Sequence, residues 1–194
     1  PDHSRIRKLV QYGFTNRYIT SLEPQIKKIV EDCLDKVHNQ DSFDLIEDLA
    51  KPLPAIVIAK MMGLPNEDLD QFQAWSEDLL VGVGGIGTTR EDIKRSGDAY
   101  EALINYFEEI ILSRKNSPGD DFIGKLIQAE EEGDKLNIKE MYGTCLLLLI
   151  AGHETTTRLI GNGIFTLFNH LDQMNHLKNN FDLIPNAIEE MLRF

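Results

Sequence analysis

The chain has 194 residues, and 42% of them are apolar, which is enough for a packed core and excludes a wholly disordered polypeptide. Its formal net charge of −12 argues against nucleic acids and anionic membrane surfaces as main partners, because both bind clustered lysine and arginine. The length fits one domain or part of one.

In the first half, apolar residues recur at helical spacing, so the sequence predicts a mainly α fold with few strands. Gly63 and Pro65 mark a helix end, because glycine accepts the left-handed conformation and proline cannot continue the helix. Asn66 is expected to cap the helix that follows. The helices predicted here span residues 2–12, 18–37, 43–62 and 67–80.

The second half begins with a glycine-rich loop at 81–89 and continues in helices with polar turns between them. Asn137 and Glu140 have the spacing of a capping box, so they should begin the longest helix. Residues 146–151 are apolar all round, so this helix must run through the interior. The predicted helices span 91–114, 122–131 and 138–170, and a last one starts near Pro185.

The two cysteines, Cys33 and Cys145, lie in apolar stretches of helical period, with no secretory signal before them. We expect buried free thiols in a reducing compartment, and therefore a cytoplasmic protein. The most apolar run, 145–151, is far shorter than the roughly 20 residues that cross a bilayer. We expect neither a transmembrane nor a targeting segment.

Residues 151–156, Ala-Gly-His-Glu-Thr-Thr, lie at the centre of the longest predicted helix. Glycine inside a helix costs about 1 kcal/mol relative to alanine, and threonine hydroxyls can bond back to carbonyls one turn earlier and bend the helix. A buried carboxylate is costly unless it is paired or protonated. The segment predicts a local bend, with the Glu154 carboxyl and the Thr155 hydroxyl beside a gap, and Glu154 is a candidate proton carrier.

Two other interpretations of this segment stay open to test. One is a kinked core helix with a hydrogen-bonded polar pocket and no further role. The other is a zinc hydrolase, because His153-Glu154 begins like the motif His-Glu-x-x-His. Position 157 is threonine, so the second histidine is missing and the zinc interpretation is disfavoured.

Following a run of leucines, Ala-Gly-x-Glu-Thr-Thr resembles the oxygen-binding helix of cytochromes P-450. The resemblance implies that Ala151, Gly152 and Thr155 line a haem. It also implies that Glu154 and Thr155 deliver protons to dioxygen and are the catalytic residues.

Glu190 and Arg193 match the same family's Glu-x-x-Arg, which follows the first motif in the expected order. Residues three apart share a helix face, so the two charges can pair, although such pairs are common on solvated helices. The resemblance implies a structural ion pair behind the haem.

At the start, His3 and Arg7 share one helix face and could hold a carboxylate, although a solvent-facing basic helix has the same pattern. Residues 1–7 resemble the family's Pro-x-His-x-x-x-Arg, which implies that His3 and Arg7 contact the haem propionates. We further expect Arg5 and Lys8 to help dock an acidic electron-transfer partner.

Residues 82–87, Gly-Val-Gly-Gly-Ile-Gly, fit the dinucleotide-binding pattern G-x-G-x-x-G. That fingerprint needs a preceding strand, and residues 69–80 have a helical pattern instead. A mobile loop between two helices is the better interpretation. The resemblance places such a loop over the substrate pocket, where it could act as a gate.

The family's haem-ligand loop, Phe-x-x-Gly-x-x-x-Cys-x-Gly, lies beyond Glu-x-x-Arg, and this chain ends at Phe194 before it. The family's partly β N-terminal region is also missing. We therefore expect residues 1–194 to be the central helical part of a single cytochrome P-450 domain, truncated at both ends and without a metal ligand. Alone, it should be inactive and expose apolar surface, so that it aggregates or binds haem weakly.

The resemblance implies a segment of a haem-thiolate monooxygenase whose cofactor is haem b, iron protoporphyrin IX. The complete protein would hydroxylate an apolar small molecule with O₂ and two electrons from a ferredoxin or flavodoxin and its reductase. The alternative is a catalytically inactive helical remnant without haem, either inert or acting by protein contacts. The sequence does not predict which apolar compound is the substrate.

Overall fold

The structure, a computed structural model, describes residues 2–82, 88–131 and 134–193, and within these ranges it is mainly α-helical. This confirms the predicted fold class. The α-helices are α1 (Asp2–Gln11), α2 (Asn16–Asp35), α3 (Pro52–Met61), α4 (Leu69–Val81), α5 (Arg90–Arg114), α6 (Phe122–Gln128), α7 (Ile138–Asn169), α8 (Leu171–Asn179) and α9 (Ile184–Met191). The shorter elements are the π-turn η1 (Ile46–Ala50), the 3₁₀ turns η2 (Asn66–Asp68) and η3 (Phe181–Leu183), and the antiparallel strands β1 (Glu130–Glu131) and β2 (Asp134–Lys135).

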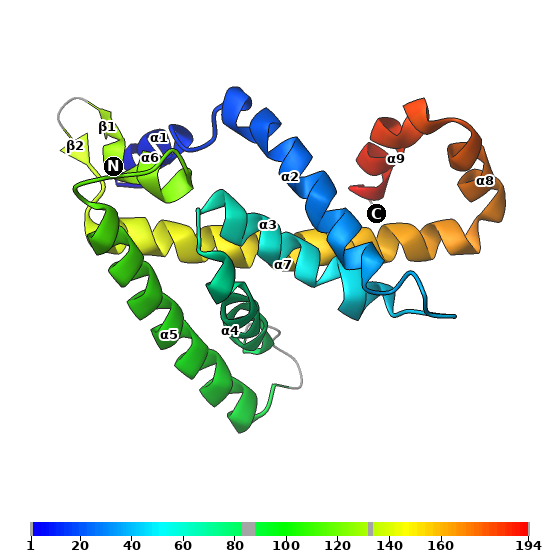
Figure 1. The fold of residues 1–194 in the computed structure, drawn as a ribbon, viewed down its shortest axis with the longest axis horizontal. Coiled ribbons are helices and arrows are strands. Elements are labelled where there is room, and N and C mark those ends of the chain that lie inside the picture. The colour runs from blue at the N-terminus through cyan, green and yellow to red at the C-terminus, as the bar shows by residue number, and fades with distance from the viewer. Residues whose placement is uncertain (1, 83–87, 132–133, 194) are drawn as a thin grey trace.

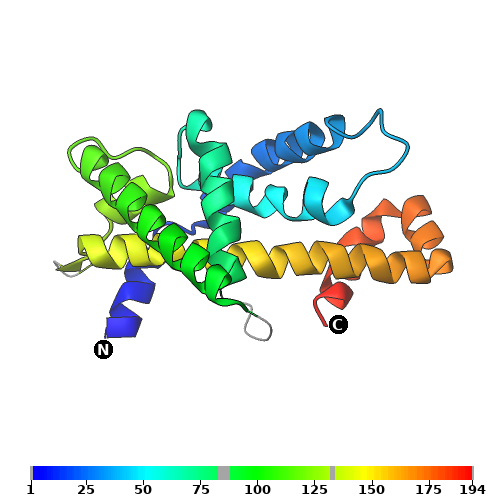
Figure 2. The ribbon, with the colours of Figure 1, turned by 90° about the horizontal axis from the view of Figure 1, so that it is seen from below.

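Helix α7, 32 residues long, runs the length of the molecule, and the other elements are arranged along it (Figure 1). It is α-helical throughout, so the polar residues at 151–156 do not interrupt it. Figure 2 shows that α1 and the C-terminal end of the chain project from the same side of α7, whereas α2 and α3 lie on the other side. By length and hydropathy, no helix of the described ranges qualifies as a membrane span.

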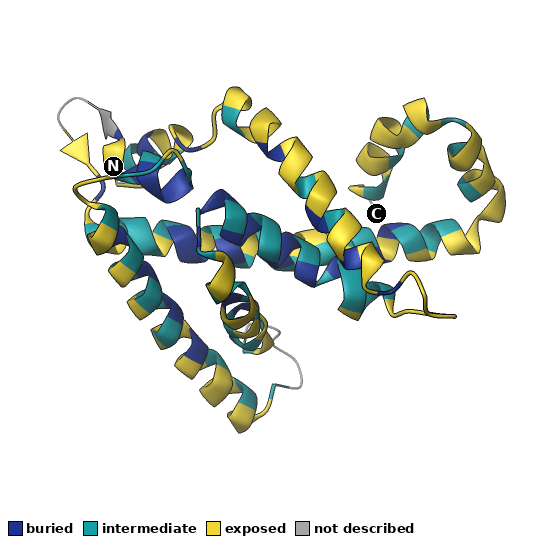
Figure 3. Cartoon of the chain, in the orientation of Figure 1, coloured by how far each residue is buried: buried dark blue, intermediate teal, exposed yellow. Residues whose placement is uncertain are grey.

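The core lies where α3 to α6 meet the N-terminal half of α7, as the concentration of buried residues in Figure 3 shows. Burying each large apolar side chain contributes about 1.5–3 kcal/mol. Helices α8 and α9 have no buried residue, so the C-terminal part is packed more loosely. The largest fully buried side chains include Phe72, Phe107, Phe122, Leu103, Ile123 and Leu149.

The predicted helix ends are partly confirmed. Asn137 and Glu140 form the capping box that begins α7, and Gly63 has a φ of 70° after α3. A second capping box, of Thr89 with Asp92, begins α5 and was not predicted, because aspartate replaces the usual glutamate at its third position.

Asn66 does not cap α4, so that prediction is wrong. The chain makes the 3₁₀ turn η2 first, and α4 begins only at Leu69, with no side-chain cap at Asp68. The Asn66 side chain instead accepts a hydrogen bond from Lys60.

Two other boundaries differ from the prediction, and one predicted segment is not tested. Helix α6 ends at Gln128 because Ala129 is extended, and the strands β1 and β2 follow where a longer helix and a turn were expected. Residue His170, with φ −133° and ψ 70°, separates α7 from α8, which was not predicted. The predicted glycine loop falls largely at 83–87, outside the described residues.

Candidate functional site

Helix α7 has an open side marked by three residues spaced one turn apart. Leu147, Ala151 and Thr155 are all exposed, and Leu147 is 66% exposed in a helix that is otherwise largely buried nearby. Residues four apart share a helix face, so the three form one stripe. We call Leu147, Ala151 and Thr155 the open stripe. It presents one large apolar side chain, one small one and one hydroxyl.

The Thr155 hydroxyl donates a hydrogen bond of 2.5 Å to the Ala151 carbonyl one turn earlier. This back-bond was predicted for the segment, and it forms without a break in the helix. A hydroxyl has one proton and two acceptor sites, so Thr155 can still accept from a neighbour on the open side.

Glu154, next to this stripe, is half-buried rather than buried, and its carboxylate forms an ion pair with Arg158 one turn later. Among the described residues, its ion-pair partner is therefore Arg158. The spacing of four residues from glutamate to arginine is a known helix-pair signal, so this ion pair could have been predicted from the sequence.

Gly152 lies on the packed side of α7, toward α3. A side-chain carbon added there would meet the Ile58 Cδ1 atom at 3.1 Å. Gly152 and Ala151 therefore lie on different sides of α7, since successive helix residues point roughly 100° apart, and the role of Gly152 beside a haem stays a prediction. The glycine allows α7 and α3 to approach closely.

His153 is 2% exposed, and its Nδ1 atom has no hydrogen-bond partner. Burial lowers the pKa of its ring, and a hydrogen bond with the Lys51 backbone opposes that shift in part. Within the described residues, no group of three histidines, cysteines or acids could hold a metal ion.

The buried His153 predicts a pH-dependent stability. The unfolded chain binds a proton near the ordinary histidine pKa of 6.5, and the folded chain binds it only at lower pH. The free energy of unfolding should therefore fall as the pH drops below about 6.5 toward the lower folded-state pKa. Above about pH 6.5, His153 should not change it. Urea unfolding of the wild type and of His153→Gln from pH 8 to 5 measures this. Parallel curves for the two proteins would contradict the prediction.

The polar side chains of helix α1 differ in whether they have partners inside the molecule. His3 and Arg7 are exposed, and within the described residues their side chains make no hydrogen bond or ion pair. Arg5 forms ion pairs with Glu140 at the start of α7 and, at 3.4 Å, with Asp134 of β2. Arg5 thus links α1 to the start of α7, and its expected role in docking an acidic partner stays a prediction.

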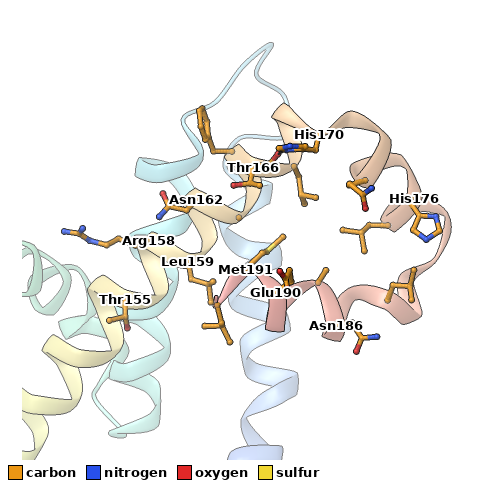
Figure 4. Close-up of a pocket in the computed structure, with 18 residues that line it drawn as sticks. Thr155, Arg158, Leu159, Asn162, Thr166, His170, His176, Asn186, Glu190 and Met191 are labelled. Atoms are coloured by element: carbon orange, nitrogen blue, oxygen red, sulfur yellow. Dashed lines mark hydrogen bonds between the residues drawn. The ribbon is translucent and has the colours of Figure 1, made fainter. Parts of the chain in front are cut away.

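A cavity of about 790 Å³ lies beside the C-terminal half of α7, between that helix, α8 and α9 (Figure 4). Thr155 lines it at one end, and Leu159, Met191 and Glu190 line it further along. The Glu190 carboxylate accepts from the Nε atom of Arg193 at 3.0 Å, so the predicted pair is present, with both side chains largely exposed.

Both cysteines lie on packed surfaces. Cys145 is fully buried on α7, and burial raises the pKa of its thiol to about 12. Cys33 is buried on α2, and its pKa is also raised by burial. Both are free thiols, as predicted, and at neutral pH both stay protonated and are unsuited to bind a metal as thiolates.

The structure combines one long helix, which carries Ala-Gly-x-Glu-Thr at its centre, with a Glu-x-x-Arg pair near the end of the chain. The chain belongs to the cytochrome P450 family, whose model matches residues 1–191. Membership of this family implies a haem cofactor.

Individual relatives match the whole chain. It is 40% identical to a cytochrome P450 of Bacillus subtilis and 38% identical to a vitamin D(3) 25-hydroxylase of Pseudonocardia autotrophica, and it covers 46% of each. The crystal structure of CYP109E1 from Bacillus megaterium in complex with testosterone superposes with a TM-score of 0.92, at 38% identity and 52% coverage of that chain. The chain thus spans about half the length of the proteins it matches.

Proposed function

We propose that this chain forms the haem-facing helical part of a monooxygenase that inserts one oxygen atom of O₂ into an apolar small molecule. One observation carries the proposal: the open stripe of α7 and the exposed His3 and Arg7 side chains of α1 lie on surfaces that the core leaves uncovered. Two electrons would come from a ferredoxin or flavodoxin through its reductase, and the cofactor would be haem b.

The exposed residues fit that cofactor. Ala151 is small enough for a flat macrocycle to approach α7 closely, and Leu147 offers it an apolar contact. His3 and Arg7 lie on a helix that projects from the same side of α7 as the C-terminal end (Figure 2). Donors of this kind suit the two propionates, and arginine can hold a carboxylate bidentately.

Haem, when bound, supplies the activation of O₂. Thr155 would accept a proton at its Oγ1 atom on the open side and pass on its own, which it otherwise donates to Ala151. Glu154, which is half-buried and paired with Arg158, would exchange protons with solvent. Neither Cys33 nor Cys145 would supply the thiolate ligand, because both are buried as thiols.

The relatives and the lining of the site support an apolar substrate class. One relative is a vitamin D(3) 25-hydroxylase, and one similar structure contains testosterone. Together with the apolar Leu147 beside the proposed haem position, these support an apolar substrate. Fatty acids, terpenoids and polyketides belong to the same chemical class.

Haem retention by the complete protein tests the proposal. Replacing both His3 and Arg7 with alanine should speed haem loss to an excess of apomyoglobin by roughly tenfold to a hundredfold, since a hydrogen bond to a charged group contributes about 1.5–3 kcal/mol. Arg17→Ala, an exposed cation at the start of α2, is the charge-matched control and should retain haem normally.

Two outcomes would contradict the proposal. Haem loss at the wild-type rate in the double variant would remove the roles of His3 and Arg7. A complete wild-type protein that binds no haem at all would favour the alternative, a helical remnant that acts through protein contacts or is inert.

A further inference from the structure

Two prolines at the start of α3 leave a buried carbonyl without its usual partner. In an α-helix, the Ala50 carbonyl would accept from the backbone N–H of residue 54, but that residue is Pro54 and has no N–H. Ala50 is 0% exposed, so water cannot take the place of that donor. The chain just before it is the π-turn η1, in which the Lys51 N–H bonds to the Ile46 carbonyl at 2.9 Å.

Thr157 of α7 supplies the missing donor. Its hydroxyl lies 3.0 Å from the Ala50 carbonyl oxygen, and the two residues are 107 positions apart in the chain. The same hydroxyl lies 2.9 Å from the carbonyl of His153, one turn earlier on α7. A threonine hydroxyl has one proton, so it is shared between the two carbonyls.

The bond comes from a packed face of α7. His153, four residues before Thr157 on the same face, is 2% exposed. The Thr157 hydroxyl thus joins this face of α7 to the residue where η1 ends, just before α3, and the bond fixes how α7 is rotated against α3.

Thr157 and Thr155 are two positions apart, so they point roughly 200° apart around the helix axis. One faces the core and the other faces the open stripe. We propose that Thr157 is a positioning residue: its bond to Ala50 fixes the rotation of α7, and thereby the place of the Thr155 hydroxyl and of Ala151. This inference rests on the proposed function, in which that hydroxyl handles protons.

Thr157→Val in the complete enzyme tests the inference, because valine keeps the shape and removes the hydroxyl. The product formed per electron pair should fall roughly threefold to tenfold, since small displacements of a reacting group have large kinetic effects. Thr157→Ser keeps the hydroxyl and should restore the wild-type yield of product per electron pair, which we call the coupling. Thr156→Val, at the exposed neighbouring position, is the matched control and should change nothing.

A double variant separates positioning from mere stability. Pro54→Ala returns a backbone N–H to the Ala50 carbonyl, so Pro54→Ala/Thr157→Val should regain the thermal midpoint that Thr157→Val loses. The link between α7 and η1 stays broken, so the double variant should remain uncoupled. Coupling that recovers together with the thermal midpoint, or that never falls in Thr157→Val, would overturn the inference.

The outcome for Thr155 shows which idea has failed. If Thr155→Val uncouples the enzyme and Thr157→Val does not, only the positioning role is wrong. If neither variant uncouples it, the proposed proton role of Thr155 is wrong as well.

Discussion

Replacing Thr155 with valine in the complete protein is expected to lower the product formed per electron pair by about tenfold or more. A positioned proton donor contributes roughly 10²–10⁴ to a rate, and the loss would appear as electrons consumed without product. The Thr155 hydroxyl is the polar group of the open stripe, and it already bonds to Ala151. Product measured by chromatography, divided by the NAD(P)H consumed, gives this ratio.

The neighbouring threonine provides the control. Thr156→Val removes a hydroxyl of the same kind one position along the helix, so it accounts for a general effect of β-branched apolar substitution. The ratio of product to NAD(P)H should stay at the wild-type value there. An unchanged ratio in Thr155→Val would remove Thr155 from the proton path.

Gly124→Ala is expected to destabilise the fold strongly, by about 3 kcal/mol, at the upper end of what overpacking costs. An added side-chain carbon at this position in α6 would lie 1.9 Å from the backbone carbonyl oxygen of Gly119, and no rotamer change can relieve a backbone contact. The backbone must shift instead. The shift would disturb Asp121, which caps α6 through the Gly124 N–H and pairs with Arg114.

Replacing a second glycine with alanine should change the free energy of unfolding in the opposite direction. Gly97, exposed in the middle of α5, has nothing within 4 Å of an added side-chain carbon, so alanine there should stabilise the helix by about 0.5–1 kcal/mol. Urea unfolding of both variants gives the two free energies. Equal effects at Gly97 and Gly124 would show that backbone entropy alone decides, and would refute the packing argument.

Local patterns predicted what depends on local chemistry. The helical period and the Asn137–Glu140 capping box located α7, and the conformational freedom of glycine located the turn at Gly63. The Glu190–Arg193 pair followed from helix geometry alone. The predicted helix cap at Asn66 was wrong because a 3₁₀ turn and a helix start share the same polar signals, and only the tertiary structure decides between them.

Other features depend on residues far apart in the sequence. The pairing of Arg5 with Glu140 joins positions 135 residues apart, and nothing in the pattern of α1 indicated it. Predicting the side of α7 on which Gly152 lies requires the position of Ile58 on α3. The donation from Thr157 to Ala50 was in principle inferable from Pro54, but only for a reader who knew which helix lies beside that carbonyl.

The division of α7 into a packed side and an open side also decides which of its residues can be replaced without loss of stability. A residue such as Leu147, 66% exposed, adds little to the core, so its replacement changes what the helix presents at small cost to folding. Positions on the opposite side, such as the fully buried Leu149, lack that freedom. The side chains on the open side of α7 can thus be exchanged while the packed side keeps the fold unchanged.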